Sequence, residues 1–381
     1  MTVQHVRVGD ALRLERRPVQ VDPTAQYSPI GVRSFAKGLI RYQACTGAEL
    51  SKLRYFELPA ESLVVSNIKA WEGAVAVAGK GDVDLVASNR FLAYVPVIDD
   101  LCVRYIWHYF ASDAGTTALS KASPGSADRN RTLGIKAFEA LSVPLPSLPE
   151  QQEYVAYLDR LFAMSAQSEE ATNSAVAVVA SLRNQLVRNS DHIEVGLGEL
   201  ASQVQRPRAV LPNETFRTAG VRWYGEGLFE RDVLPGSAIE AKLLYEVKPG
   251  DLVYNRLFAW KGSFALASKS HDGLVVSSEF PTLRIDEDRV LPEFLREWLA
   301  LPSVWDRVIS LSSGGTPTSR NRLKVEALLT LKVPLPSLAA QRTIVARLER
   351  CRETLVAVRR RTELSDALPQ AARNEVFSKL D

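Results

Sequence analysis

The longest uninterrupted pattern of apolar and polar positions lies in residues 149–189. No proline or glycine follows Pro149 within this stretch, and residues that favour helix, Glu, Ala, Leu, Arg and Gln, are abundant. About 40 residues at a rise of 1.5 Å would form a helix about 60 Å long. Its apolar positions lie on one face at helical spacing, interrupted by polar residues in the middle: Val155, Leu158, Phe162, Val176, Val179, Leu182 and Leu186.

A second apolar stripe lies in the C-terminal part of the chain. Its residues are separated alternately by four and three positions, the seam of a coiled coil. Pro369 would kink or end this helix because proline lacks an N–H and clashes with the preceding turn, and Val376, Phe377 and Leu380 would pack beyond it. Two striped helices bury their stripes most economically against each other, so we predict an antiparallel pair. The second stripe consists of Ile344, Leu348, Cys351, Leu355 and Val358.

The segments before each helix have a mixed pattern. Short β-rich runs at residues 62–65, 74–78 and 252–254 are punctuated by glycine and proline, which is typical of strands joined by turns. Residues 101–110 and 292–301 space their apolar side chains for a helix instead. An α+β fold is therefore expected for both segments.

The chain repeats itself. Residues 143–161 and 333–351, 190 positions apart, agree at 11 of 19 positions and share the block VPLPSL, followed by Gln, Val, Ala, Leu and Arg. The prolines exclude the middle of a helix, and a serine then precedes the helical pattern, so each window predicts an extended segment that enters a helix. Earlier segments repeat at a spacing of 189, as in residues 63–73 and 252–262.

Two copies of one design follow from this repetition. We predict two pseudo-symmetric globular domains separated by a pair of long antiparallel helices. The expected boundaries are residues 1–148 for the first domain, 149–188 for the central helix, 189–338 for the second domain and 339–381 for the C-terminal helix.

Composition adds little constraint. The 381 residues are 46% hydrophobic and 24% charged, which is ordinary for a globular protein, and the net charge of +3 permits a nucleic-acid partner without requiring one. Three widely spaced cysteines argue against a disulfide framework, and neither a signal-peptide core nor an apolar run long enough for a bilayer is present. A cytoplasmic location is therefore expected.

Motifs for catalysis are missing from the sequence. It contains no phosphate-binding G-x-x-x-x-G-K-[ST] loop, no G-x-S-x-G elbow and no H-E-x-x-H, and its four histidines and three cysteines lack metal-ligand spacing. The glycine-rich run at residues 313–316 lacks the lysine of a phosphate loop. The Glu240-Ala241-Lys242 triplet has no counterpart in the first copy. We expect no catalytic residues and no bound metal.

Polar and basic residues recur in turn-like positions of both copies. Polar Ser/Gly/Thr loops at residues 123–131 and 313–322 both end in Arg-Asn-Arg; small residues allow close approach to a sugar–phosphate chain, and Arg and Asn pair with base edges. Each of these features also has an interpretation without DNA. The nearby Trp71 and Trp260 would pack in the core, and the arginines that follow Gly-Val would form salt bridges that fix a turn. The Ser/Gly/Thr loops would simply be exposed to solvent. The candidate DNA-binding residues are Arg33, Asn67, Lys69, Arg129, Asn130, Arg131, Arg222, Asn255, Arg256, Thr316, Thr318, Arg320, Asn321 and Arg322.

The doubled PLPSL-x-x-Q-x-x-x-V-A-x-L block, each time after a Gly/Ser/Thr loop and before a long helix, resembles the DNA-specificity subunit of type I restriction–modification systems. The resemblance covers essentially the whole chain and includes the Ala-Trp-x-Gly element of both copies. The first copy departs from it with Ser123-Pro124-Gly125-Ser126 where the second has Ser313-Gly314-Gly315-Thr316.

This resemblance implies a function for each part. Each globular domain would be a target-recognition domain that reads one half of a split, asymmetric site in double-stranded DNA. The helices would set the distance between half-sites and dock two methyltransferase subunits. Methylation with S-adenosylmethionine and cleavage driven by ATP with Mg²⁺ would belong to partner methyltransferase and restriction subunits in phage defence, so the chain itself would catalyse nothing.

Two other classes of function remain open at this stage. A protein–protein scaffold with paired binding domains around a coiled coil would show no salt-dependent DNA binding. An enzyme, such as a methyltransferase, is disfavoured because no [Asp/Asn]-Pro-Pro-aromatic motif and no cofactor-binding glycine motif occurs.

Overall fold

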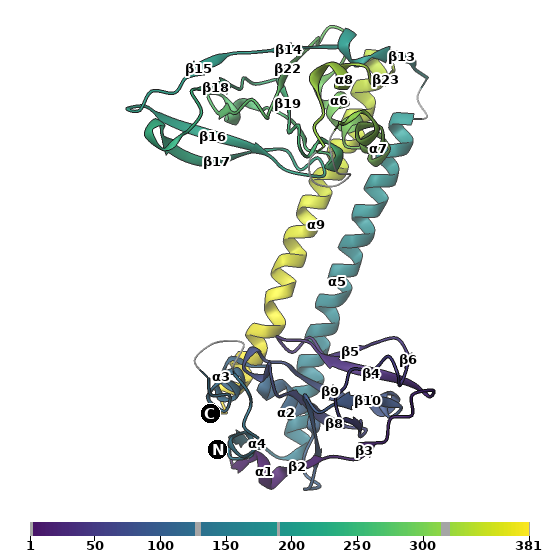
Figure 1. Ribbon diagram of the computed structural model, residues 1–381, viewed down its shortest axis with the longest axis vertical. Helices are drawn as coiled ribbons and strands as arrows, with labels where there is room; N and C mark the ends of the chain where they lie inside the picture. The colour runs from purple at the N-terminus through teal and green to yellow at the C-terminus, as the bar shows by residue number, and fades with distance from the viewer. Residues whose placement is uncertain (1–2, 126–130, 189–190, 314–320, 381) are drawn as a thin grey trace. The chain divides into compact units, whose positions relative to one another are not determined.

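A computed structural model describes residues 3–125, 131–188, 191–313 and 321–380. The chain forms two compact units (Figure 1). Unit 1 contains Met1–Glu170 and Arg360–Asp381, and unit 2 contains Ala171–Arg359. Each unit therefore combines a mixed α/β globular part with one segment from each of the two long helices.

The globular part of unit 1 is built on two mainly antiparallel sheets. One has the strand order β2-β11-β8-β9, and the other has the order β3-β7-β10-β4-β5, with β6 paired to β4 and a parallel contact between β10 and β4. The strands are β1 (His5–Arg7), β2 (Leu12–Glu15), β3 (Pro18–Val19), β4 (Gln26–Val32), β5 (Leu39–Arg41), β6 (Cys45–Thr46), β7 (Tyr55–Glu57), β8 (Ser62–Ser66), β9 (Val75–Ala78), β10 (Leu85–Ser88), β11 (Phe91–Pro96) and β12 (Ser142–Pro144).

Short helices cover the sheet of strands β2, β11, β8 and β9. The face of α2 that carries Tyr105, Ile106 and Phe110 is fully buried in the core that this sheet forms, as its apolar spacing predicted. The helices of this part are α1 (Val8–Ala11), η1 (Ala70–Glu72), η2 (Lys80–Asp82), α2 (Val103–Phe110), α3 (Asp113–Lys121) and α4 (Ile135–Glu139).

Unit 2 repeats this plan, with one longer strand, β17, in the place of β5 and β6. Its sheets have the orders β14-β22-β19-β20 and β15-β18-β21-β16-β17, again with one parallel pairing, between β16 and β21. The strands are β13 (Ile193–Gly196), β14 (Ala201–Val204), β15 (Pro207–Ala209), β16 (Thr215–Val221), β17 (Leu228–Pro235), β18 (Leu243–Glu246), β19 (Leu252–Tyr254), β20 (Phe264–Leu266), β21 (Val275–Val276), β22 (Thr282–Ile285) and β23 (Lys332–Leu335).

The short helices of unit 2 also correspond to those of unit 1, except for one turn of helix at Gly236–Ala238 that has no counterpart among the described residues of unit 1. The helix predicted over residues 292–301 is confirmed as α6, which ends at Leu299. A separate helix, α7, begins at Pro302, because proline fixes a first helical turn and cannot continue the previous helix. The helices are η4 (Leu197–Glu199), η5 (Gly236–Ala238), η6 (Ala259–Lys261), η7 (Lys269–His271), α6 (Pro292–Leu299), α7 (Pro302–Leu311) and α8 (Val325–Leu329).

The repeated VPLPSL block connects a strand to a long helix in both units. Its first residues form β12 and β23, which pair with β1 and β13 near the start of each copy. The glutamine that follows is fully buried: Gln151 accepts from the Cys102 N–H (2.9 Å) and donates to the Asp100 and Pro146 carbonyls, and Gln341 bonds the Leu291 N–H in the same way (2.8 Å). The shared glutamine therefore fixes each helix start to its globular part.

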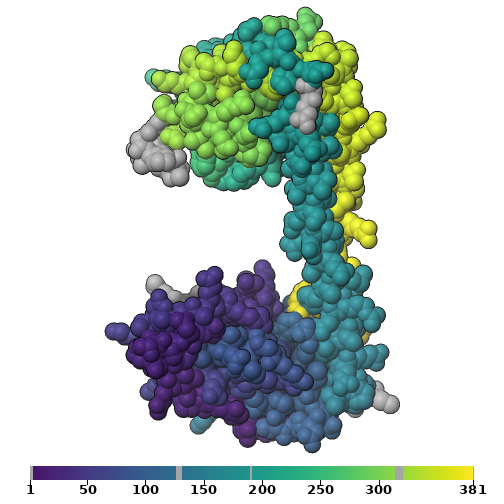
Figure 2. Space-filling view, turned by 90° about the vertical axis from the view of Figure 1, so that its right-hand side faces the viewer, coloured from purple at the N-terminus to yellow at the C-terminus, as the bar shows by residue number. Residues whose placement is uncertain are grey.

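Helices α5 (Leu148–Arg188) and α9 (Leu338–Ser378) lie side by side within each unit (Figures 1 and 2). In unit 1 they are antiparallel, since Ser165 bonds Asp366 (2.6 Å) and Ser168 bonds Thr362 (3.0 Å). In unit 2 the C-terminal residues of α5 share a hydrophobic cluster with Ile344 of α9. The predicted α+β fold with a pair of long helices is confirmed.

The prediction that Pro369 could end the second helix is wrong, because α9 continues through it to Ser378. Contacts with unit 1 hold the helix on both sides of the proline, through Thr362 before it and Gln370 after it, whose side chain donates to the Ala111 carbonyl (3.1 Å). Tertiary contacts thus override the local preference. Val376, Phe377 and Leu380 pack into the core of unit 1, as predicted.

A buried polar cluster lies where three helices meet in each unit. In unit 1, His108 of α2 lies between Asp159 of α5 (2.9 Å) and Arg373 of α9 (3.2 Å). In unit 2, Glu297 of α6 accepts hydrogen bonds from arginines of α5, α6 and α9. His108 and Glu297 occupy equivalent positions 189 residues apart, so the same junction is built around an imidazole in unit 1 and a carboxylate in unit 2.

Burial and pairing fix the charge of these groups. Burial lowers the pKa of His108 to about 4, and Arg373, which can only donate, makes the His108 Nδ1 an acceptor and so also disfavours its protonation. Burial opposes the charge of Glu297, but the guanidinium groups of Arg352, Arg296 and Arg183 hold the pKa of this carboxyl below its ordinary value.

Within the described residues, every helix is too short or too polar to cross a lipid bilayer.

Candidate nucleic-acid interface

The ends of β8 and β19 hold the candidate polar residues in the same backbone frame. The Asn67 N–H donates to the Arg90 carbonyl and its own carbonyl accepts from Leu133; at the equivalent position, the Arg256 N–H donates to Glu279 and its carbonyl accepts from Leu323. The structure therefore joins the residues after each Arg-Asn-Arg segment to the strand that precedes the Ala-Trp-x-Gly turn. Two of the predicted sequence clusters become one site in each unit.

The side chains at this site differ between the units. The Oδ1 atom of Asn67 is buried and has no hydrogen-bond partner, whereas the Asn255 side chain caps its own turn by accepting from the Leu257 N–H (2.9 Å). Arg256 borders a small cavity of about 180 Å³ and its Nε is buried without a hydrogen-bond partner. Buried polar atoms left unsatisfied in this way are candidate contacts for an external hydrogen-bonding group.

Arg131 and Arg322, the last residues of the two Arg-Asn-Arg segments, have different partners. Arg131 donates to Ser120 and Ser123 and its guanidinium lies 4.8 Å from the ring centre of Trp71. Arg322 is more exposed and forms an ion pair with Glu279 (2.9 Å). Asn321 precedes Arg322 and is partly buried.

Lys69 and the two tryptophans complete the site. Lys69 bonds Glu72 (2.7 Å) and lies 5.0 Å from the Trp71 ring, so in unit 1 two cations flank one partly buried indole. In unit 2, Trp260 packs against the hydrophobic core and donates to the Leu257 carbonyl (3.1 Å). The core-packing interpretation therefore holds for Trp260, although the Lys261 Nζ lies 5.0 Å from its ring centre. Trp71 has two basic neighbours, Lys69 and Arg131.

Arg33 and Arg222 lie at the base of an equivalent turn in each unit. Both side chains are exposed, and both backbone N–H groups bond the carbonyl of a glycine five residues on, Gly38 and Gly227. The Arg222 guanidinium lies 5.0 Å from the ring centre of Phe229. The candidates Arg129, Asn130, Thr316, Thr318 and Arg320 lie outside the described residues.

The predicted helix-packing residues fall into two groups. Those near the ends of the helices pack into the globular cores as well as along the helix pair. Leu158 is fully buried in the core of unit 1, where Val155 packs against it, and Ile344 and Leu348 are buried in the core of unit 2 with Leu186 against them. Phe162 contacts Arg373, 4.3 Å from its ring centre. Those near the middle of the helices are partly buried: Val176, Val179, Leu355 and Val358.

The sequence pattern missed an exposed aromatic residue at the tip of the turn that follows each Gly-Val-Arg. Phe35 in unit 1 and Tyr224 in unit 2 have 74% and 58% of their surfaces exposed and adopt left-handed backbone conformations. The alignment at a spacing of 189 pairs them and was the available signal. Among the described residues, no group of His, Cys, Asp and Glu side chains is arranged to hold a metal ion.

Part of the chain is similar to a known protein family. Residues 36–177 match the family model for the type I restriction modification DNA specificity domain. Over these residues the chain is similar to a type I restriction–modification DNA specificity domain. The resemblance drawn from the repeated VPLPSL block is thereby confirmed, and the matched region begins at residue 36 and ends at residue 177, within α5. No sequence match was found among curated proteins.

Solved structures extend the likeness of fold beyond the matched domain. The HsdS subunit from Thermoanaerobacter tengcongensis is 18% identical, with 99% of this chain and 97% of that chain covered and a TM-score of 0.53. A chain from a structural study of complex assembly and conformational transition of the type I R-M system is 17% identical at the same coverages, with a TM-score of 0.67.

A third solved structure agrees. The S subunit of the type I restriction-modification system from M. genitalium is 11% identical, covers 99% of both chains and has a TM-score of 0.53. At these identities the likeness concerns the fold alone. It places the second unit in the same architecture as the specificity domain of the first.

Proposed function

We propose that the chain is a DNA sequence-recognition subunit that reads a split, asymmetric site in double-stranded DNA and directs partner methyltransferase and restriction subunits to it. Residues 1–148 and 189–338 would be the two recognition domains. The observation that carries the proposal is the repetition of the specificity domain: a second unit with equivalent strand order, turns and anchoring hydrogen bonds. Two similar domains with different side chains are suited to reading two different half-sites.

The helix pair would act as the spacer. Residues 149–188 and 339–381 connect the domains, and each helix start is fixed to a globular part by a buried glutamine, Gln151 or Gln341. A helix converts residue number into length at 1.5 Å per residue, and half-sites one helical turn of DNA apart lie on the same face. The partly buried residues of the helix pair would dock two methyltransferase subunits.

Catalysis would reside on the partners. S-adenosylmethionine would be bound by the methyltransferase subunits, and ATP and Mg²⁺ by the restriction and translocase subunits. This division agrees with the lack of catalytic motifs in the sequence. The weak net charge of +3 is compatible with DNA binding if the partners share the phosphate contacts.

Co-expression with a partner methyltransferase, followed by mapping of methylated bases in the host genome, tests the proposal. We expect a single asymmetric split motif with a fixed gap. A methyltransferase that stays inactive, or one that marks a short uninterrupted motif, would contradict two recognition domains and favour a protein-binding scaffold.

A further inference from the structure

The fold exposes an aromatic ring in each unit by straining the backbone. Phe35 and Ala36 have φ angles of 60° and 52°, and Tyr224 and Gly225 have 58° and 72°. Backbone bonds from Phe35 to the Glu72 carbonyl and from Ala36 to the Gly73 carbonyl (both 2.8 Å) hold the turn on the Ala-Trp-x-Gly segment. A bulky residue in this left-handed region is unfavourable, so its presence at an exposed site points to a role.

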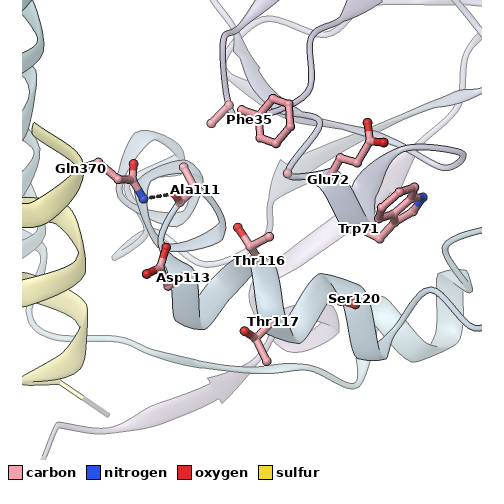
Figure 3. A pocket seen from close by; sticks show the side chains of 11 residues that line it. Phe35, Trp71, Glu72, Ala111, Asp113, Thr116, Thr117, Ser120 and Gln370 are labelled. Carbon is pink, nitrogen blue, oxygen red and sulfur yellow. Dashed lines mark hydrogen bonds between the residues drawn. The ribbon is translucent and has the colours of Figure 1, made fainter. Parts of the chain in front are cut away.

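A cavity of about 830 Å³ lies beside the Phe35 turn in unit 1. Figure 3 shows Phe35, Trp71 and Glu72 on one side and Thr116, Thr117 and Ser120 of α3 along another. The volume is within the range of ligand pockets. The walls combine aromatic rings, hydroxyl groups and carboxylates.

Unit 2 fills the corresponding place with its own side chain. Trp305 lies 189 positions after Thr116. Its Nε1–H donates to the Leu299 carbonyl (2.7 Å), and the Thr116 hydroxyl donates to the Phe110 carbonyl (3.4 Å), which is the carbonyl equivalent to that of Leu299. Both side chains therefore extend from the same position toward the same backbone group.

The neighbours of Trp305 locate its indole ring. The ring centre lies 5.9 Å from that of Tyr224, and a Cβ placed on Gly262 would lie 2.3 Å from the indole. A Cβ placed on the equivalent Gly73 would make only ordinary van der Waals contacts, with the Thr116 Oγ1 at 3.6 Å and the Phe35 backbone at 3.8 Å. Unit 1 thus leaves open, between its turn and α3, the space that a planar bicyclic ring occupies in unit 2.

We propose that the cavity beside Phe35 receives a nucleobase of the first half-site, turned out of the DNA stack and stacked on the Phe35 ring. This inference rests on the proposed function and adds a specificity-determining residue to the first domain. Purines are planar and bicyclic and carry N–H donors, as indole does. The Phe110 carbonyl and the Asp113 and Glu72 carboxylates are acceptors for the amino group of a base.

The charges around the cavity favour a base over a phosphate group. The charged side chains that line it, Glu72 and Asp113, are acidic, whereas basic side chains lie next to it: Lys69 bonds Glu72, and Arg131 donates to Ser120. Such an arrangement places a neutral ring inside and the sugar–phosphate chain at the basic edge. Exposed aromatic rings next to basic residues are typical of sites that stack bases.

Variants that fill the cavity or remove the Phe35 ring, combined with DNA that lacks single bases, test the inference. The full chain assembled with its co-expressed methyltransferase would be titrated with a duplex carrying the mapped motif, and with duplexes carrying an abasic position at each place in the first half-site. Base stacking is worth about 1–3 kcal/mol. We therefore expect one abasic position to weaken binding about 10-fold in the unaltered complex.

The variants are Thr116→Trp, which copies unit 2, Phe35→Ala, and Tyr42→Ala as the control that removes another exposed aromatic ring of unit 1 outside the cavity. Thr116→Trp and Phe35→Ala should each weaken binding of the intact duplex about 10-fold, and the same abasic position should then cause no further loss. Tyr42→Ala should bind within about 2-fold of the unaltered chain, and the second half-site should be read normally throughout.

Several results would overturn the inference. Unchanged DNA binding by Thr116→Trp with a raised melting temperature would show that the cavity is only a void. Loss of methyltransferase assembly with unchanged DNA binding would assign the cavity to a protein partner. If Thr116→Trp does not fold, additive losses from Phe35→Ala and the abasic position count against base stacking. If the unaltered chain directs methylation to a split motif while the variants give one of these results, the inference about the cavity fails and the proposed function holds.

Discussion

At the residue scale, the two recognition sites share a backbone and differ in side chains. Arg131 and Arg322 follow equivalent loops, yet the first lies against Trp71 and Ser120 and the second pairs with Glu279. Arginine can form two hydrogen bonds with the edge of a guanine. An arginine that gives up its present partners for such an edge therefore reads the DNA sequence directly. Different neighbours at the same backbone position give each domain its own chemistry.

Arg322→Ala should therefore impair one half-site only. We expect binding of the mapped duplex to weaken about 10-fold, since a bidentate base contact is worth about 1–3 kcal/mol. Discrimination should relax at one position of the second half-site, measured by methylation of single-base variants. Arg217→Ala removes another exposed arginine from an ion pair in the same unit, with Glu230, and serves as the control. Equal losses at both half-sites would contradict two independent domains.

His108 makes the stability of unit 1 depend on pH. Its folded-state pKa of about 4 lies below the ordinary value of 6.5, so the unfolded chain binds the proton first as the pH falls. Stability is therefore greatest above pH 6.5 and decreases down to about pH 4, by about 3 kcal/mol in total at 1.36 kcal/mol per pKa unit. Hydrogen exchange of α2 at a series of pH values measures this loss.

His108→Gln is the informative variant for that measurement. Glutamine keeps an acceptor for Arg373 and a donor for Asp159 but does not titrate. The decrease in stability between pH 6.5 and 4.5 should largely disappear. His271→Gln is the control, because the pKa of His271 is also lowered by burial but His271 lies in unit 2. An unchanged decrease in His108→Gln would rule out His108 as its source.

At the element scale, the helices are fixed by polar groups as much as by their apolar stripes. Gln151 and Gln341 hold the helix starts, and the clusters around His108 and Glu297 join three helices in each unit. A buried polar group is costly unless every partner is present, so these junctions select one packing of the helices over sliding alternatives.

Glu297→Gln should destabilise unit 2. It removes the carboxylate that accepts from Arg183, Arg296 and Arg352 and leaves three guanidinium groups close together. Breaking a buried ion pair from one side costs about 3–5 kcal/mol. Urea denaturation combined with hydrogen exchange of α6 measures the loss. Glu349→Gln, which removes a half-exposed carboxylate from the same cluster, should cost much less. Similar losses in both variants would show that burial does not set the cost.

At the scale of the whole molecule, the chain is a tandem repeat in which each compact unit takes helical segments from both copies. Unit 1 includes the end of α9 and unit 2 includes the end of α5. Each copy therefore completes the unit of the other. As a result, the apolar stripe of each long helix packs partly in unit 1 and partly in unit 2.

The spacer function predicts a change in the DNA gap when the helices are lengthened. Four residues, about one turn, would be inserted after Ser168 in α5 and before Thr362 in α9, so that the facing positions stay in register. Mapping of methylated sites should then show the same two half-sites separated by a longer gap. Insertion in α5 alone is the control and should impair assembly. An unchanged gap in the double insertion would show that the helices do not set the spacing.

The sequence alone determined the features that depend on local pattern and repetition. Helical periodicity predicted α5 from residue 149 where the structure begins it at Leu148, and β-rich runs predicted β8, β9 and β19. The repeat predicted two copies, and the VPLPSL block predicted an extended segment that enters a helix. The spacing of apolar residues depends on which face of a single helix or strand is buried, and not on its partners in the fold. The sequence is therefore sufficient to predict these elements.

Only the tertiary structure decided what those faces contact. It placed Leu158 in a globular core, carried α9 through Pro369 and assigned Arg322 to Glu279. It also showed that Thr116 leaves open the space that Trp305 fills. These features arise from side chains brought together from distant parts of the chain, where packing and paired charges outweigh local preference.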